Sequence, residues 1–177
     1  MKKFMTTVAL AVSVAGAQGT TTAQTTTPIK PAPPQTVKVT LTQDQIKAST
    51  VNGKTVETVV PNPKTVLPGD VLREEVTVVN VAGKIIKNPV ISVPVPKGTV
   101  YAGSATPTGD RWNTVYSIDS GKTYSATPMK TVTVTENGKS VTKQVAAAPK
   151  DYTNVRWQIG QLGPDDTLKL SFRVRVN

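Results

Sequence analysis

The chain of 177 residues contains no cysteine and no histidine, and aromatic side chains make up only 5% of it. Without cysteine it has no disulfide framework, no thiolate nucleophile and no iron–sulfur cluster. Without histidine it has no Ser-His-Asp triad and no His-ligated zinc, copper or haem. Acidic residues are also scarce, with 11 Asp plus Glu against 21 Lys plus Arg, so the formal net charge is +10.

Two β-branched residue types supply almost a third of the chain, with 28 Thr and 27 Val. A branched Cβ restricts the side chain in a helix but packs well on the pleated surface of a sheet. The sequence also contains 14 Pro and 12 Gly, which punctuate the apolar segments. This composition predicts an all-β protein made of short strands and tight turns.

The first seventeen residues have the pattern of a secretory signal peptide. Met1–Lys3 is basic, Phe4–Ala17 is uncharged and mostly apolar, and Ala15-Gly16-Ala17 matches a cleavage site that ends at Ala17. The apolar run is shorter than the ~20 residues needed to span a bilayer, although it would suit a short N-terminal anchor helix. We expect export to the periplasm, cell envelope or cell surface. Cleavage would remove two lysines and lower the net charge from +10 to +8.

Residues 18–35 are rich in Thr, Pro and Gln and have almost no apolar side chains. Such a segment cannot bury enough surface to offset the entropy of ordering its chain. We interpret it as a disordered spacer, either a stalk that holds a domain away from a surface or an unstructured remainder behind the signal peptide. No later apolar run is long enough to cross a membrane, so no transmembrane segment is expected after cleavage.

From residue 36 onward, apolar and polar residues alternate in short segments, which is typical of half-buried strands. Asn52-Gly53 and Asn137-Gly138 each separate two such segments and predict type I′ hairpins. Pro94 interrupts one segment, and a proline within a strand favours a sheet edge. We predict one antiparallel β-sandwich domain over 36–177 with nine or ten strands. The expected strands are 36–41, 54–60, 71–81, 90–95, 98–101, 115–118, 131–135, 140–145, 154–159 and 168–176.

Three blocks in this order make the pattern more specific. Residues 68–80 (PGDVLREEVTVVN) are similar to P-G-D-x-h-x-a-x-h-x-h-x-N, where h is apolar and a is aromatic. Residues 93–99 (VPVPKGT) resemble a corner of the form h-P-x-G, and residues 157–172 (WQIGQLGPDDTLKLSF) resemble W-x-h-G-x-L-x-P-G-x-x-x-x-h-x-h. Together they resemble the DUF11 domain family of bacterial surface proteins. That resemblance implies an immunoglobulin-like β-sandwich and a structural role at the cell envelope.

The sequence departs from this family pattern in three places. Glu74 replaces the usual aromatic residue on the inward face, and Asp165 replaces the usual glycine of the late turn. An insertion of about residues 106–153 separates the corner from the last two strands. This insertion contains the second Asn-Gly turn, so it would add strands or a lateral flap.

The two tryptophans have different predicted roles. Trp157 lies on a strand with apolar neighbours and is expected to anchor the core. Arg111 and Trp112 lie in a loop-like stretch, with Tyr101 and Tyr116 nearby in sequence. A flat aromatic ring beside an arginine can stack on a sugar ring or a base, so Arg111, Trp112 and Tyr116 are candidate binding residues. The alternative is that Trp112 packs the insertion onto the sandwich.

Lys169, Arg173 and Arg175 lie on one face of the last predicted strand. Such a basic stripe can contact an anionic envelope polymer, lipid head groups or an acidic protein. The alternative is a solvated face on which positive charges prevent aggregation of sheet edges. Nucleic-acid binding is disfavoured because the sequence shows no platform of interleaved basic and aromatic residues.

Glu74 is the one carboxylate expected on an inward face. With a lysine and Asn80 or Asn154, it has the residue types of an isopeptide cross-link. The favoured alternative is that Glu74 lies near a strand end and reaches water.

Few residues suit metal binding or catalysis. Asp119, Asp165 and Asp166 fall in predicted turns, but they lack the D-x-D-x-D spacing that a calcium site needs. No general base is predicted beside any Ser or Thr. The chain is therefore expected to have no catalytic residues, no metal and no cofactor.

The sequence predicts an exported, non-enzymatic structural or accessory subunit of the bacterial cell envelope that acts through protein–protein contacts. Exposed strand edges and the insertion are the expected contact surfaces. The alternative is a binding module for anionic or sugar polymers of the envelope that uses the basic stripe and Arg111/Trp112.

Overall fold

The computed structural model describes residues 36–177, so the predicted signal peptide and spacer lie outside the described residues. The described chain is all-β, with twelve strands and a single 3₁₀ turn. Within this range no helix has the length and apolarity required to cross a membrane. The strands are β1 (Val37–Val51), β2 (Lys54–Pro61), β3 (Val71–Asn80), β4 (Ile86–Lys87), β5 (Val90–Pro94), β6 (Thr99–Gly103), β7 (Trp112–Ser117), β8 (Met129–Glu136), β9 (Lys139–Ala146), β10 (Asn154–Ile159), β11 (Gln161–Leu162) and β12 (Thr167–Val176), and the 3₁₀ turn η1 is Pro149–Asp151.

The larger sheet has five antiparallel strands in the order β2-β1-β3-β12-β6. Strand β3 lies at its centre, where Val76 is opposite Leu41 of β1 and Leu170 of β12. Alternate residues of β3 and most of β12 are buried, as the period-two pattern predicts. This sheet therefore has an inner apolar face and an outer face rich in charged side chains.

The smaller sheet has three antiparallel strands in the order β5-β10-β7. Its inner side chains join those of the larger sheet in one apolar core, so the two sheets pack as a sandwich. Trp157 is fully buried in this core, and its indole N–H donates to the carbonyl oxygen of Thr106 at 3.2 Å, which confirms the predicted anchor. Strand β5, which ends at Pro94, lies at a sheet edge as predicted.

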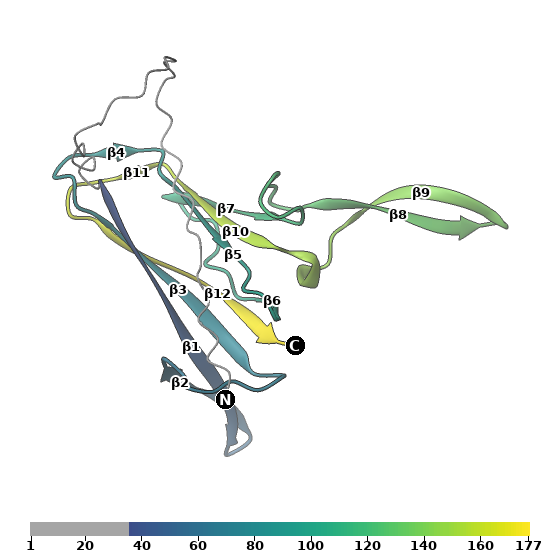
Figure 1. The fold of residues 1–177 in the computed structure, drawn as a ribbon, viewed down its shortest axis with the longest axis horizontal. Coiled ribbons are helices and arrows are strands. Elements are labelled where there is room, and N and C mark those ends of the chain that lie inside the picture. The colour runs from purple at the N-terminus through teal and green to yellow at the C-terminus, as the bar shows by residue number, and fades with distance from the viewer. Residues whose placement is uncertain (1–35) are drawn as a thin grey trace, which may run out of the picture.

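Strands β8 and β9 form a two-stranded ribbon, here called the arm (residues 129–146), which extends away from both sheets (Figure 1). Its turn has the positive φ angles of a type I′ hairpin, 50° at Asn137 and 75° at Gly138. The first Asn-Gly turn has similar angles, 51° at Asn52 and 73° at Gly53. Both hairpins predicted from the sequence are therefore present.

Several expectations need correction. Residues 36–177 contain twelve strands where nine or ten were expected, because β4 and β11, which pair with each other, are too short to show a sequence periodicity. Strand β1 continues to Val51 and does not stop at residue 41. The expected insertion supplies the arm and also strand β7, which pairs with β10 in the smaller sheet.

The prediction that Glu74 reaches water at a strand end is wrong. Glu74 lies in the middle of β3, opposite Gln43 and Phe172, and is only 2% exposed. Asn80 donates its amide to the carbonyl oxygens of Lys84, Leu162 and Gly163, so it serves to fix a loop.

Candidate functional site: a projecting arm and the hollow at its base

The two faces of the arm differ in chemistry. The antiparallel register places Val134 opposite Val141 and Lys143 opposite Val132 on one face. Thr133 is opposite Thr142 on the other face. The first face, here called the valine face, carries Val132, Val134, Val141 and Val145, all half-buried, and is crossed by the ion pair between Lys143 and Glu136. The opposite face carries exposed hydroxyl and amide side chains.

The edges of the arm are free along its length. Among residues 36–177, β8 and β9 pair only with each other. At every second residue of each strand, the backbone N–H and C=O point outward from the ribbon. These groups therefore have no ladder partner in this part of the chain. Such edges can accept a further strand.

Contacts at the base of the arm fix where it leaves the sandwich. The ammonium of Lys130 is 2.5 Å from the carboxylate of Asp151 in η1, and this hydrogen bond and charge hold the pKa of Asp151 below its usual range. The backbone N–H of Ala147 donates to the carbonyl oxygen of Pro128 at 2.8 Å. Both Pro128 and Ala147 are buried, so the arm begins at an ordered base.

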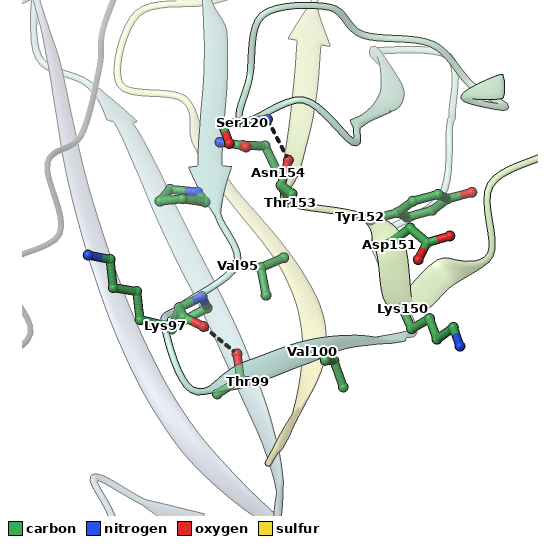
Figure 2. Close-up of a pocket in the computed structure, with 12 residues that line it drawn as sticks. Val95, Lys97, Thr99, Val100, Ser120, Lys150, Asp151, Tyr152, Thr153 and Asn154 are labelled. Atoms are coloured by element: carbon green, nitrogen blue, oxygen red, sulfur yellow. Dashed lines mark hydrogen bonds between the residues drawn. The ribbon is translucent and has the colours of Figure 1, made fainter. Parts of the chain in front are cut away.

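A shallow hollow of about 410 Å³ lies beside this base (Figure 2). It is bounded by the corner after β5, the start of β6, the loop after β7 and the segment from η1 into β10. Its apolar surface comes from Pro94, Val95, Pro96, Val100 and Tyr152. Its polar rim comes from Lys97, Thr99, Ser120, Lys150, Asp151, Thr153 and Asn154.

The charge of the hollow is positive. Lys97 and Lys150 are both exposed and stand on opposite sides of the hollow in Figure 2. The only acid of the rim, Asp151, is already bound to Lys130. The hollow therefore offers two ammonium groups and no free carboxylate.

The predicted basic stripe lies on the outer face of the larger sheet, and part of it is neutralised. Arg173 makes a bidentate contact with Glu57 at 2.7 and 2.6 Å, and this contact raises the pKa of the guanidinium. Lys169 is 3.3 Å from Glu75. Only Arg175 of the three has no ionic partner among the described residues.

Arg111 and Trp112 are also engaged by protein groups. Arg111 forms an ion pair with Asp166. The indole N–H of Trp112 donates to the carbonyl oxygen of Pro107 at 2.9 Å, and its ring packs partly against the core. This packing is the alternative that the sequence offered for Trp112. Both residues line a second, open hollow of about 370 Å³ with Asn88, Asn113 and Gln158.

Tyr116 belongs to a different part of the molecule. It stacks on Tyr152 with ring centroids 4.7 Å apart and meets the edge of Tyr101 at 5.7 Å. Burial raises the pKa of Tyr101, which also stacks on Phe172. The six predicted binding residues therefore lie in three separate places: the outer face, the end of the smaller sheet and this tyrosine cluster.

Sequence reasoning missed the tyrosine cluster and one further aromatic contact. The guanidinium of Arg156 lies 3.3 Å from the ring centroid of Tyr124, whose hydroxyl is 2.7 Å from that of Ser92. These side chains come from distant segments with no shared motif, so no local pattern indicated the contacts. The hollow was also not predicted from the sequence, although its proline-rich corner at residues 93–99 was predicted.

Two of the three aspartates considered for calcium, Asp119 and Asp166, are bound to protein donors. Asp119 accepts hydrogen bonds from the hydroxyls of Ser117 and Thr123 and from nearby backbone N–H groups, which lowers its pKa. Asp166 accepts from the N–H of Gly163, which lowers its pKa together with the contact to Arg111. In residues 36–177 no group of three or more acidic side chains is placed to hold a metal ion.

No family model, no curated protein and no solved structure matches this chain.

Proposed function

We propose that this protein is an exported, non-enzymatic contact module of the bacterial cell envelope, and that the arm is its main surface for binding a protein partner. The observation that carries the proposal is the arm itself, a two-stranded ribbon that leaves the sandwich with both edges unpaired among the described residues. The proposal includes an immunoglobulin-like, DUF11-type sandwich as the support for the arm.

The physical chemistry of a lone ribbon supports this assignment. An isolated two-stranded hairpin is at best marginally stable in water, because no further strand or helix covers either of its faces. Covering a valine removes apolar surface from water and stabilises a complex by up to about 1.5 kcal/mol per side chain. A partner that lies on the valine face would gain this burial, and a partner strand could pair with either edge.

Export is supported by the sequence alone. The basic start, the short apolar run and the small residues before Gln18 form the pattern of a cleaved signal peptide. The absence of cysteine and histidine supports a role without catalysis, because it removes the thiolate nucleophile and the imidazole base.

A crosslinking experiment in cells that naturally make the protein tests the role of the arm. A photoreactive residue at Val134 would sit on the valine face, and one at Thr133 would sit on the opposite face. We expect a discrete protein adduct from position 134 in the envelope fraction and a weaker one from position 133. A chain in which residues 130–145 are replaced by Gly-Ser-Gly should no longer form that complex, although its sandwich should remain folded.

The proposal fails if the chain without the arm co-fractionates with the same partners as the natural chain. The mass of the mature protein tests export separately. The protein recovered from the envelope should have the mass of a chain that begins at Gln18. An uncleaved cytoplasmic chain would contradict export.

A further inference from the structure

The hollow beside the arm has the chemistry of a site for a charged, hydroxyl-bearing chain. Two proline rings, two valines and Tyr152 supply apolar surface. The Ser120 hydroxyl and the Asn154 amide make no hydrogen bond to another protein group in the described part of the chain, so both are free to bind a ligand. Hydroxyl and amide groups of this kind both donate and accept hydrogen bonds.

The placement of the lysines indicates an extended ligand. Lys97 and Lys150 lie on opposite sides of the hollow with Val95 and Val100 between them, and both amino groups point outward (Figure 2). A small anion in the hollow would engage at most one of them. An ammonium on a flexible four-carbon stem can instead meet a charge on a chain that crosses the hollow and continues past both rims.

The backbone around the hollow is unsuited to pairing with a peptide strand. Pro94 and Pro96 have no N–H to donate. The N–H of Val95 already donates to the carbonyl oxygen of Thr153 at 2.8 Å, and that of Thr99 donates to the carbonyl oxygen of Pro96 at 3.2 Å. With the donors absent or used, strand addition has no ladder here. Side chains must therefore recognise the ligand, which favours a saccharide chain over an extended peptide.

We propose that this hollow binds an acidic glycan, a chain of sugar rings that bears carboxylate or phosphate groups. One ring lies over the proline and valine surface, Ser120 and Asn154 bind its hydroxyls, and anionic groups on either side reach Lys97 and Lys150. This site is separate from the valine face of the arm, so the protein could hold a partner and an envelope polymer at the same time.

Titration of the full mature chain with defined saccharides tests the site. The probes are an oligogalacturonate of about eight rings, a phosphorylated mannan fragment, galacturonate monomer and a neutral maltooligosaccharide. We expect the amide NMR signals of Thr99, Ser120 and Asn154 to shift with at least one of the two acidic chains. The neutral chain and the monomer should bind at least about tenfold more weakly, since exposed charge contacts are individually weak and add along a chain.

A matched pair of variants locates the binding. The double variant Lys97→Gln/Lys150→Gln loses two charges at the hollow, and Lys38→Gln/Lys47→Gln loses two exposed charges on β1. We expect about tenfold weaker binding of the acidic glycan for the first and less than a twofold change for the second at low salt. Circular dichroism should show both variants folded.

Several results would contradict the proposed glycan site. Equal loss in both double variants would mean a diffuse charge effect, and equal binding of monomer and oligomer would exclude a chain that spans the hollow. Tighter binding of a polyglutamate peptide than of either acidic glycan would assign the hollow to an acidic protein segment. A failure here leaves the arm proposal intact, because crosslinking at Val134 reports on the arm alone.

Discussion

The two hairpins of this molecule close with the same Asn-Gly turn but meet different surroundings. In the first hairpin, β1 pairs with β3 through Val37–Ile46 and with β2 through Asp44–Val51, so residues 44–46 lie between two strands, and the ribbon beyond them contacts β12 through Glu57 and Arg173. In the second, β8 and β9 pair only with each other among the described residues. Local turn chemistry forms both ribbons, whereas a second pairing partner determines whether a ribbon becomes part of a sheet.

The inward-facing side chains of the two hairpins also differ in what they contact. The first hairpin places Val37, Val39 and Leu41 against the core, and its Gln43 reaches the buried Glu74. The arm places its valines against each other and water. Strand β1 therefore ties the first hairpin to the folding unit, whereas the arm is an attachment available for binding.

Hydrogen exchange should separate the two hairpins most clearly. Amides of the β1–β3 ladder should open only with the whole sandwich, whereas those of the β8–β9 ladder open locally at a small cost in free energy. We expect the arm amides to exchange at least about 100-fold faster in the isolated protein, as measured by amide NMR. Equal protection of the amides in both ladders would show that the sandwich or a second copy of the chain covers the arm. A bound partner should slow the arm amides selectively.

Truncation of one apolar side chain in each hairpin should show the next largest difference. Leu41→Ala removes a half-buried side chain packed on the core and should lower the free energy of unfolding by about 2 kcal/mol. Val134→Ala should change it by less than about 0.5 kcal/mol, because Val134 touches no part of the sandwich core. Urea denaturation followed by fluorescence of the buried Trp157 measures both variants. Similar losses would mean that the arm and the sandwich unfold as one unit.

The sequence predicted the parts of this comparison that depend on neighbours in the chain. Alternation identified the inner face of β12, and the Asn-Gly pairs identified both turns. Pro94 placed β5 at an edge because a missing N–H has the same consequence in any sheet. These features need only local geometry, which explains why they were visible.

Features that depend on distant segments were not predicted. The arm could be recognised as a hairpin, but its isolation depends on the absence of a third strand, which no local pattern encodes. Arg173 meets Glu57 across 116 positions of sequence, so the stripe appeared more highly charged than it is. Glu74 was placed correctly on the inner face, but its depth depends on how Phe172 and Gln43 cover it.

Glu74 gives a pH-dependent test of the first hairpin's contact with the core. Burial raises the pKa of this carboxyl and the nearby charge of Asp44 adds to the effect, while the 2.5 Å hydrogen bond from Gln43 opposes it. Because the folded pKa is raised, its stabilising contribution is complete below the unfolded value of about 4.3 and is lost as pH rises through the folded value. Glu74→Gln should match the natural chain near pH 4 and exceed its stability by about 1–2 kcal/mol at pH 8.

The neighbouring residue provides the control for this effect. Glu75 lies on the outer face, where it contacts Lys169 at 3.3 Å and Arg73 at 3.7 Å. Glu75→Gln should lose up to about 1 kcal/mol at neutral pH, the opposite sign. Urea midpoints from pH 4 to pH 8 for both variants measure the difference. A constant offset for Glu74→Gln across this range would contradict a buried carboxyl that titrates.

The smallest expected effect compares the two turns themselves. Gly53 has φ of 73° and Gly138 has φ of 75°, and an added Cβ would meet no atom within 4 Å at either position. Alanine therefore imposes the same local strain in both turns, about 1 kcal/mol for a left-handed conformation. Gly53→Ala should lower the free energy of global unfolding by up to that amount, because Glu57 ties this ribbon to Arg173 of β12 and β1 continues from it into the β1–β3 ladder. Gly138→Ala should leave global unfolding unchanged and speed exchange of the arm amides, since its strain is released when the arm opens alone. Equal losses of global stability in the two variants would show that both hairpins unfold as one cooperative unit. The arm would then not be a free binding element.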